Sequence, residues 1–286
     1  MERSLDESRF WRGRRVWWAI GLLAFAVVAI VWRASDRVPS DATVPIHWRG
    51  STSETPAKGT LRVGSFNIHG GGGPGDAPVN LERTAALLEP LNLDLIGLYE
   101  VHGGFDGDQA KELGGTLEMA SVFAGTEYRF WHDHFGNAIL AGVPVDSVIR
   151  IDLPCTQPKR YRNALLSIVK LDGVPVHVIA AHLDTRVDHD RQFALVADLF
   201  QALEAPAVLM GDLNCTASDP LLAELLADPE VVDAIAQGGA STANRIDHIL
   251  VRGLEVESAE VIQNQASDHP LVWAEVSLPD EEGRGD

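Results

Sequence analysis

A buried strand that ends in polar side chains is the feature of this 286-residue chain that most restricts its fold. Residues 207–210 (Ala-Val-Leu-Met) are all apolar without alternation, which is typical of a strand covered on both faces. Gly211 then allows the backbone a bend or a close approach, and Asp212 and Asn214 follow. The pattern predicts either a polar site at the end of a buried strand or a turn whose side chains bond their own backbone.

Polar residues also follow other apolar runs. Strands are predicted over 61–68, 95–99, 135–140, 145–153, 163–171, 174–181, 245–251, 254–262 and 270–278. The residues at strand ends are Asn67, Glu100, Asn137, His182, Asp212, Asn214, Asp247, Asp268 and His269. Carboxylate and amide oxygens suit Mg²⁺, Mn²⁺ or Ca²⁺, whereas a zinc site needs more His or Cys at short spacing. The set predicts a hard divalent cation that polarises a phosphoryl oxygen, beside a histidine that orients or deprotonates water.

Helical patterns separate several of these strands. Helices are predicted over 80–91, 109–113, 188–203 and 220–227, with Asn80 as the cap of the first. Asp172-Gly173 between two strand patterns is a hairpin signal, whereas other strands are joined through helices. Mixed hairpin and crossover connections predict an α/β or α+β layered sandwich. We expect one catalytic domain over residues 60–279.

The N-terminal part carries a long uncharged stretch. Residues 16–32 contain no charged side chain, and at ~1.5 Å per residue they span about 26 Å, close to the ~30 Å hydrocarbon core of a bilayer. Tryptophans at positions 11, 17, 18 and 32 lie near both ends, as interfacial anchors do. The alternatives are a core helix or a signal peptide, and the sequence downstream has no clear cleavage site. The stretch predicts a transmembrane anchor.

Charges around this stretch predict its orientation. Four arginines precede it, at positions 9, 12, 14 and 15, while Arg33 and Arg37 follow with Asp36 between them. By the positive-inside bias, residues 1–15 stay in the cytoplasm and the catalytic domain lies on the extracytoplasmic side. Residues 33–59, rich in Pro, Ser and Thr, are predicted to be a linker, and residues 280–286 an acidic tail.

The predicted domain is strongly acidic. Residues 61–286 contain 14 Lys+Arg and 35 Asp+Glu, a net charge of −21, whereas residues 1–60 contain 9 and 6, a net charge of +3. A negative field repels polyanions, so we do not expect tight sequence-independent binding of nucleic acid. Bound metal cations would offset the repulsion locally.

Seven short motifs occur in the order found in one protein family. They are Ser65-Phe66-Asn67, Leu98-Tyr99-Glu100-Val101, Gly136-Asn137-Ala138, His182-Leu183-Asp184, Gly211-Asp212-Leu213-Asn214, Arg245-Ile246-Asp247-His248-Ile249 and Ser267-Asp268-His269-Pro270. Over about residues 60–278 the chain resembles the endonuclease/exonuclease/phosphatase superfamily, the deoxyribonuclease I-like fold. It departs at Tyr99, where the family usually has Gln, and at Ala141-Gly142, where Ser-Arg is common; Arg162 matches a family arginine loosely.

The resemblance implies a four-layer sandwich, with two central mixed β-sheets flanked by helices and a phosphoester-hydrolysing site at one edge. Asn67, Glu100 and Asp268 match positions of the metal site, for Mg²⁺ or else Mn²⁺ or Ca²⁺. Asp212 and Asn214 match residues that orient the attacking water and hold the scissile phosphate.

The remaining matches concern acid–base chemistry and phosphate binding. His269 matches the general base or transition-state stabiliser, and Asp247 matches its carboxylate partner. His182 matches a histidine that binds phosphate or assists the leaving group, and Asn137 a residue that orders the phosphate pocket. We expect a membrane-tethered, metal-dependent phosphoesterase that hydrolyses phosphodiester or else phosphomonoester bonds, with nucleic acid, phospholipid or a small phosphodiester as the substrate. A non-catalytic binding module is the alternative, and no feature predicts a protein partner.

Overall fold

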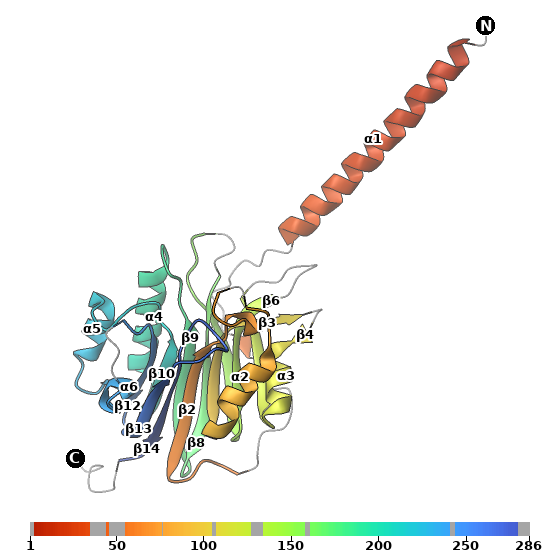
Figure 1. The fold of residues 1–286 in the computed structure, drawn as a ribbon. Coiled ribbons are helices and arrows are strands. Elements are labelled where there is room, and N and C mark those ends of the chain that lie inside the picture. Colours follow the sequence, from red (N-terminus) through yellow and green to blue (C-terminus); the bar gives the residue numbers. More distant parts are fainter. Residues whose placement is uncertain are drawn as a thin grey trace.

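The computed structural model describes residues 3–34, 44–45, 55–75, 77–104, 107–126, 134–157, 161–240 and 244–279. Within these ranges the chain forms two β-sheets of seven strands each, with helices beside them (Figure 1). A long N-terminal helix stands apart from the sheets.

The first sheet contains the buried strand predicted from residues 207–210. Its order is β1-β7-β8-β9-β10-β12-β11. The strands are β1 (Val44–Pro45), β7 (Val145–Asp152), β8 (Asn163–Leu171), β9 (Val174–His182), β10 (Ala207–Asp212), β11 (Val232–Asp233) and β12 (Asp247–Arg252). Every residue of β10 is buried, and β10 pairs in parallel with β9 and antiparallel with β12. The prediction is confirmed, because a strand with both faces covered favours apolar side chains throughout.

The second sheet has the order β13-β14-β2-β3-β6-β5, and β4 pairs with β3. The strands are β2 (Thr60–Asn67), β3 (Leu95–Gly104), β4 (Gly107–Asp108), β5 (Ala120–Gly125), β6 (His134–Ala141), β13 (Glu255–Ile262) and β14 (Leu271–Ser277). The inner faces of the two sheets share one apolar core, in which Tyr99 and Met210 take part. The Tyr99 hydroxyl donates to the carbonyl of Met210 over 3.1 Å, so this departure from the family motif joins the two sheets.

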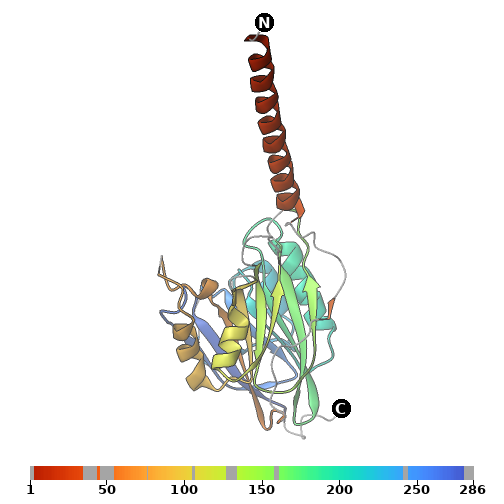
Figure 2. The ribbon, with the colours of Figure 1, turned by 90° about the vertical axis from the view of Figure 1, so that its right-hand side faces the viewer.

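Helices cover the outer faces of both sheets. α4 (His189–Ala202) and α5 (Pro220–Leu226) bury apolar side chains against the first sheet, and α2 (Leu81–Leu88) and α3 (Gln109–Thr116) against the second. Figure 2 shows these two pairs on opposite sides of the sheets. The short elements are α6 (Ala234–Gln237), η1 (His69–Gly71) and η2 (Glu89–Leu91). Two mixed sheets flanked by helices confirm the predicted α+β sandwich.

The N-terminal helix α1 (Arg3–Ala34) contains the residues predicted to cross a membrane. It points away from the sandwich in both views, and Trp17 and Phe25 are each 73% exposed (Figures 1 and 2). Among the residues that the structure describes, no helix is long and apolar enough to cross a membrane. The predicted transmembrane helix over 16–32 is therefore not confirmed. Most of the predicted linker 33–59 and the tail 280–286 lie outside the described residues, and the domain boundaries stay a prediction.

Strand β3 corrects one detail of the sequence analysis. The strand predicted over 95–99 does not stop before Glu100 but continues to Gly104. Its register against β6 shifts between Leu98 and Val101, and Glu100 has a φ of 55°. An extra residue in a left-handed conformation is a β-bulge, which interrupts the alternation of side chains without ending the strand. The alternation of side chains stops at the bulge, and for this reason the sequence pattern wrongly predicted that the strand ends before Glu100.

Candidate active site

The predicted site residues converge at one end of the sandwich. In the first sheet, Asp212 lies opposite His182 of β9 and opposite Asp247 of β12. In the second sheet, β2 and β3 are parallel, so Asn67 at the end of β2 lies beside Tyr99 and the bulge. Strands that run in the same direction bring their carboxyl ends to one edge, where polar side chains can meet.

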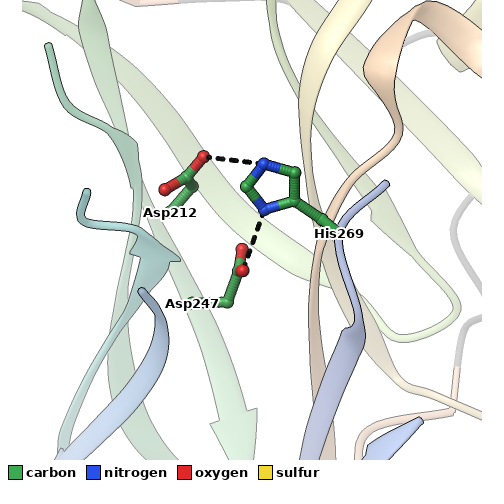
Figure 3. Close-up of side chains that lie close together, drawn as sticks. All are labelled: Asp212, Asp247 and His269. Carbon is green, nitrogen blue, oxygen red and sulfur yellow. Dashed lines mark hydrogen bonds and ion pairs between the residues drawn. The ribbon is translucent and has the colours of Figure 1, made fainter. Parts of the chain in front are cut away.

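Asp247, His269 and Asp212 form the centre of this site (Figure 3). His269 Nδ1 donates to Asp247 Oδ2 over 2.9 Å, and His269 Nε2 lies 3.8 Å from Asp212 Oδ2. The bond to Asp247 fixes the ring, because it occupies Nδ1 and leaves Nε2 directed at Asp212. Both carboxylates are buried, while the His269 side chain keeps 18% of its surface exposed. The imidazole is thus the part of this group that a substrate can reach.

Asn67 links the two sheets at this centre. Its Nδ2 donates to Asp212 Oδ2 over 3.0 Å and lies 3.5 Å from His269 Nε2. Its Oδ1 accepts from the backbone N–H of His69 over 3.1 Å, and its carbonyl accepts from the Ser267 hydroxyl over 2.7 Å. The predicted metal residue Asn67 therefore also fixes the loops that carry His69 and His269.

His182 and Glu100 lie on the other side of Asp212. His182 Nε2 is 3.4 Å from Asp212 Oδ2 and 4.0 Å from Glu100 Oε1. The His182 side chain is buried, whereas that of Glu100 is 26% exposed. Because a bulge redirects the side chain of its extra residue, the left-handed turn at Glu100 accounts for a carboxylate at the mouth of the site.

Asn214 and Asp268 flank the centre. Asn214 has a φ of 52°; its N–H donates to Asp212 Oδ1 over 3.2 Å and its Nδ2 to the Leu183 carbonyl over 2.9 Å. The Asx turn that was the alternative for this motif is therefore present, and it orients the Asp212 carboxylate. Asp268 is half exposed, and its Oδ1 lies 3.4 Å from His69 Nδ1.

Asn137 is engaged elsewhere. Its Nδ2 donates to the carbonyl of Asn163 over 2.8 Å and to Asn163 Oδ1 over 2.9 Å. Asn163 is buried and donates in turn to the carbonyl of Ala124. Asn137 thus ties β6 to β8 at the same end of the sandwich, and its predicted phosphate contact stays a prediction.

The charges of the site shift three pKa values. Burial and the neighbouring charge of Asp247 raise the pKa of Asp212 to about 7, against the opposing charge of His269. Burial alone would lower the pKa of His269, but the hydrogen bond and the charge of Asp247 outweigh it and raise the pKa to about 9. Burial and the positive charge of Arg162 hold the pKa of His182 well below its usual value. At neutral pH, His269 is a cation and His182 a neutral imidazole.

The donor set fits a hard divalent cation. Glu100, Asn67 and Asp268 offer carboxylate and amide oxygens, and the buried carboxylate of Asp212 lies beside them. Asp212, Asp247 and His269 also bring ligand atoms within 4.8 Å of one another. The 2.9 Å bond between His269 and Asp247 explains that proximity without an ion. The oxygen side of the site, which includes the partly exposed carboxylate of Glu100, could therefore hold a cation.

Sequence reasoning missed several supporting residues. Asn163 is the first residue of β8 and bonds Asn137. A polar residue directly before an apolar strand is the signal that could have identified it. His69 lies in the single 3₁₀ turn η1, which is too short to show a period, and Ser267 belongs to the last motif but was given no role. His189 Nε2 and His248 Nε2 each lie 2.9 Å from a carbonyl, of Leu213 and of Cys215, and so hold both sides of the Asn214 turn.

Comparisons with known proteins place this geometry in a family. The sequence model of the Endonuclease/Exonuclease/phosphatase family matches residues 64–269, and a comparison with curated proteins gives no match. An endonuclease/exonuclease/phosphatase structure from Beutenbergia cavernae is 25% identical, with a TM-score of 0.66 over 77% of this chain and 72% of that one.

Two further structures share the fold at lower identity. A mannosyl-6-phosphatase from Bacteroides thetaiotaomicron is 18% identical, with a TM-score of 0.58 over 76% of this chain and 100% of that one. D. rerio TDP2 complexed with single-strand DNA product is 18% identical, with a TM-score of 0.60 over 76% of this chain and 99% of that one. The match over residues 64–269 and the site at the strand ends lead to one conclusion: this chain belongs to the endonuclease/exonuclease/phosphatase family.

Proposed function

We propose that the chain is a divalent-metal-dependent phosphoesterase that hydrolyses phosphodiester bonds by attack of water. The observation that carries the proposal is the bond of 2.9 Å between Asp247 and His269, whose other nitrogen faces Asp212. Two carboxylates around one imidazole are an arrangement for proton transfer and for stabilising developing charge. A non-catalytic binding module would not need this arrangement.

The side chains divide the work according to their protonation. His269 is positively charged and partly exposed, so its Nε2–H can donate to a phosphoryl oxygen as negative charge grows on it. Asp212 accepts the proton of the attacking water, because its pKa of about 7 suits a base near neutral pH. Asn214 fixes the carboxylate of Asp212 through its backbone N–H. His182, neutral and 3.4 Å from Asp212, is placed to donate to the phosphate or the leaving oxygen.

Glu100, Asn67 and Asp268 would hold the cation. When bound, a divalent ion supplies Lewis-acid stabilisation of a phosphoryl or leaving oxygen. It would also offset the negative charge around Asp212.

A panel of phosphoesters tests the proposal. The purified protein should hydrolyse at least one substrate among a single-stranded oligonucleotide, a glycerophosphodiester, a phospholipid and a sugar phosphate, in the presence of Mg²⁺ or Mn²⁺. Phosphomonoesters are the second candidate, since a mannosyl-6-phosphatase shares the fold. No hydrolysis of any member by the wild-type protein would contradict the proposal.

The pH dependence follows from the two raised pKa values. Asp212 must lose its proton to act as a base, so kcat/KM should rise as pH increases toward about 7, with a midpoint below that value because a bound cation lowers the pKa of Asp212. His269 must stay protonated, so kcat/KM should fall as pH increases through about 9. Asp247→Asn removes the charge that raises the pKa of His269 and should move the alkaline limb to lower pH. Profiles from pH 5 to about 10 for both proteins check this, and an unmoved alkaline limb would contradict the assignment.

We also propose that α1 holds the domain at a membrane, on the extracytoplasmic side. The exposed apolar side chains of α1, including Trp17 and Phe25, support this, since a soluble protein rarely exposes such a surface. Four arginines precede residue 16. An alkaline phosphatase reporter fused after Leu278 should be active. Activity only from a cytoplasmic reporter at that position would contradict the topology, and a mature chain beginning near Ser35 would indicate cleavage instead.

Charge predicts how the protein responds to salt. Because residues 61–286 carry a net charge of −21, we expect duplex DNA to bind weakly and without sequence preference. Each neutralised phosphate adds about 0.9 to the slope of log affinity against log salt, so one or two contacts give a shallow slope. The slope is measured from the affinity of the Asp212→Asn variant for duplex DNA over a series of salt concentrations. A slope that matches about six or more phosphates would contradict this prediction.

A further inference from the structure

A second layer of side chains lies beyond the catalytic centre on the same face of the second sheet. Asn137 of β6 points to the inner face, because it bonds Asn163 of the first sheet. Phe135 lies two residues before Asn137 and therefore points to the same face, ~6.7 Å further along the strand. His102 of β3 pairs directly with Phe135 and shares that face.

Arg162 completes this outer layer, which we define as His102, Phe135 and Arg162. The His102 and Phe135 rings meet edge to face, with centroids 5.8 Å apart and an angle of 82°. The guanidinium carbon of Arg162 lies 5.8 Å from the centroid of the Phe135 ring. Arg162 directly precedes Asn163, the first residue of β8, and Phe135 lies two residues before Asn137 on β6. The outer layer therefore lies next to the bonded Asn137–Asn163 pair, farther toward the edge of the sheets. All three side chains are partly exposed.

The outer layer is held in place by bonds to the loop after β2. The backbone N–H of His102 donates to Gln109 Oε1 over 2.8 Å, and Gln109 Nε2 donates to the carbonyl of Gly70 over 2.7 Å. A Cβ atom at Gly70 would lie 3.0 Å from the His102 ring, so the loop packs closely on the imidazole. A fixed aromatic surface costs little entropy when it binds a ligand.

The outer layer is also close to the catalytic residues. Ala164 of β8 pairs with Ala181 of β9, so Arg162, two residues before Ala164, and His182, which directly follows Ala181, lie at the same edge of the first sheet. The positive charge of Arg162 acts on His182 and helps to lower its pKa. His182 in turn lies 3.4 Å from Asp212. A phosphate at the catalytic centre therefore has the aromatic and cationic groups of the outer layer beside it.

We propose that the outer layer binds the nucleobase of a nucleotide whose phosphate lies at the catalytic centre, which makes the substrate a single-stranded nucleotidic phosphoester. The inference rests on the proposed phosphoesterase function and names its substrate class. An aromatic ring with an arginine over it suits a flat, electron-rich heterocycle, and every base presents such a face. Stacking also needs no contact with neighbouring phosphates, so it provides affinity on a domain whose net charge is −21.

Matched oligonucleotides test the inference. One is a short single strand with normal bases, and the other has the same phosphodiesters with abasic tetrahydrofuran units in place of the nucleosides. The wild-type protein should cleave the first with the higher kcat/KM. Phe135→Leu should lower kcat/KM for the first by ~10-fold, because it removes one stacking ring, and should change the second less than about 2-fold.

Phe123→Leu is the control for the same change on the other face of the sheet. Phe123 is half-buried in the outer core against Gly103, so its variant should treat the two substrates as the wild type does. Melting curves establish that both variants fold. Equal cleavage of the two oligonucleotides by the wild type, or equal losses on both in Phe135→Leu, overturns the inference and leaves the phosphoesterase intact. If neither oligonucleotide is cleaved while another phosphoester is, the inference also fails; if no phosphoester is cleaved, the proposed function fails with it.

Discussion

Replacing His269 by alanine is expected to lower kcat by ~100-fold or more. The imidazole is bonded to Asp247 at Nδ1 and is charged at neutral pH, because its pKa is raised to about 9. Its loss removes the donor that faces the phosphate and also the positive charge next to Asp212. Initial rates on the best substrate of the panel measure the effect, with metal at saturating concentration.

A double mutant tests whether His269 and Asp247 act as one unit. If Asp247 acts only through His269, Asp247→Asn should be harmful alone but should add little to His269→Ala, since residues that act as one unit are strongly non-additive. Losses that add in the double mutant would contradict the pairing. His177→Ala is a suitable control, because His177 lies five residues before His182 on β9 and its ring Nδ1 lies 3.0 Å from the carbonyl of Glu204. Its rates should stay within about 2-fold of the wild type.

The helices and strands that could be predicted are those in which the pattern of apolar residues in the sequence agrees with the pattern of buried residues in the structure. β10 was readable because all its residues are buried, and the β8–β9 hairpin because Asp172 and Gly173 adopt the positive φ that their turn requires. The helix after Asn80 begins as predicted, and the Asn80 side chain accepts from the N–H of Arg83. In each case local sequence preference and tertiary burial favour the same structure.

The parts that could not be predicted depend on tertiary pairing. β1, β4 and β11 have two residues each, too few for any period to be recognised, and exist because a neighbouring strand offers free backbone groups. β5 (Ala120–Gly125) consists largely of Ala, Ser and Gly, so it has neither an alternation of side chains nor the continuous run of large apolar side chains that identified β10. Glu100 has a positive φ in the bulge. A residue other than glycine adopts this conformation only when the surrounding contacts stabilise it, so the sequence near Glu100 does not reveal it.

The candidate site was more predictable than the connections around it. Asn67, His182, Asp212, Asp247 and His269 meet through direct contacts, as their places at strand ends suggested. The bonds that orient them come from Asn214, Ser267 and His69, two of which lie outside any predicted strand end. A strand-end residue is recognisable in a sequence because its neighbours are apolar, whereas a loop residue acquires its contact only after folding.

Glu100→Gln is expected to raise the metal concentration for half-maximal activity by at least ~10- to 100-fold, the range found when even an outer partner of a metal ligand is lost. A hard divalent cation needs anionic oxygen, and Glu100 is the partly exposed carboxylate that faces His182 and Asp212 from the bulge. Excess chelator should abolish the activity of both proteins. Saturating metal should restore much of the rate in Glu100→Gln, because the acid–base residues are unchanged.

Direct binding separates this role from a merely structural one. Calorimetric titration of Mn²⁺ into the wild type and Glu100→Gln, without substrate, should show the same loss of affinity as the activity assay. Glu112→Gln on α3 is the matched control, because it removes the same charge from an exposed position in the second sheet's helical layer and should bind Mn²⁺ as the wild type does. Equal Mn²⁺ affinities in the wild type and Glu100→Gln, with circular dichroism unchanged, would move the cation away from the bulge. Asp268 and the buried carboxylates of Asp212 and Asp247 would then be the remaining anionic candidates, and an ion held by Asp247 and His269 would have to break the 2.9 Å bond between them.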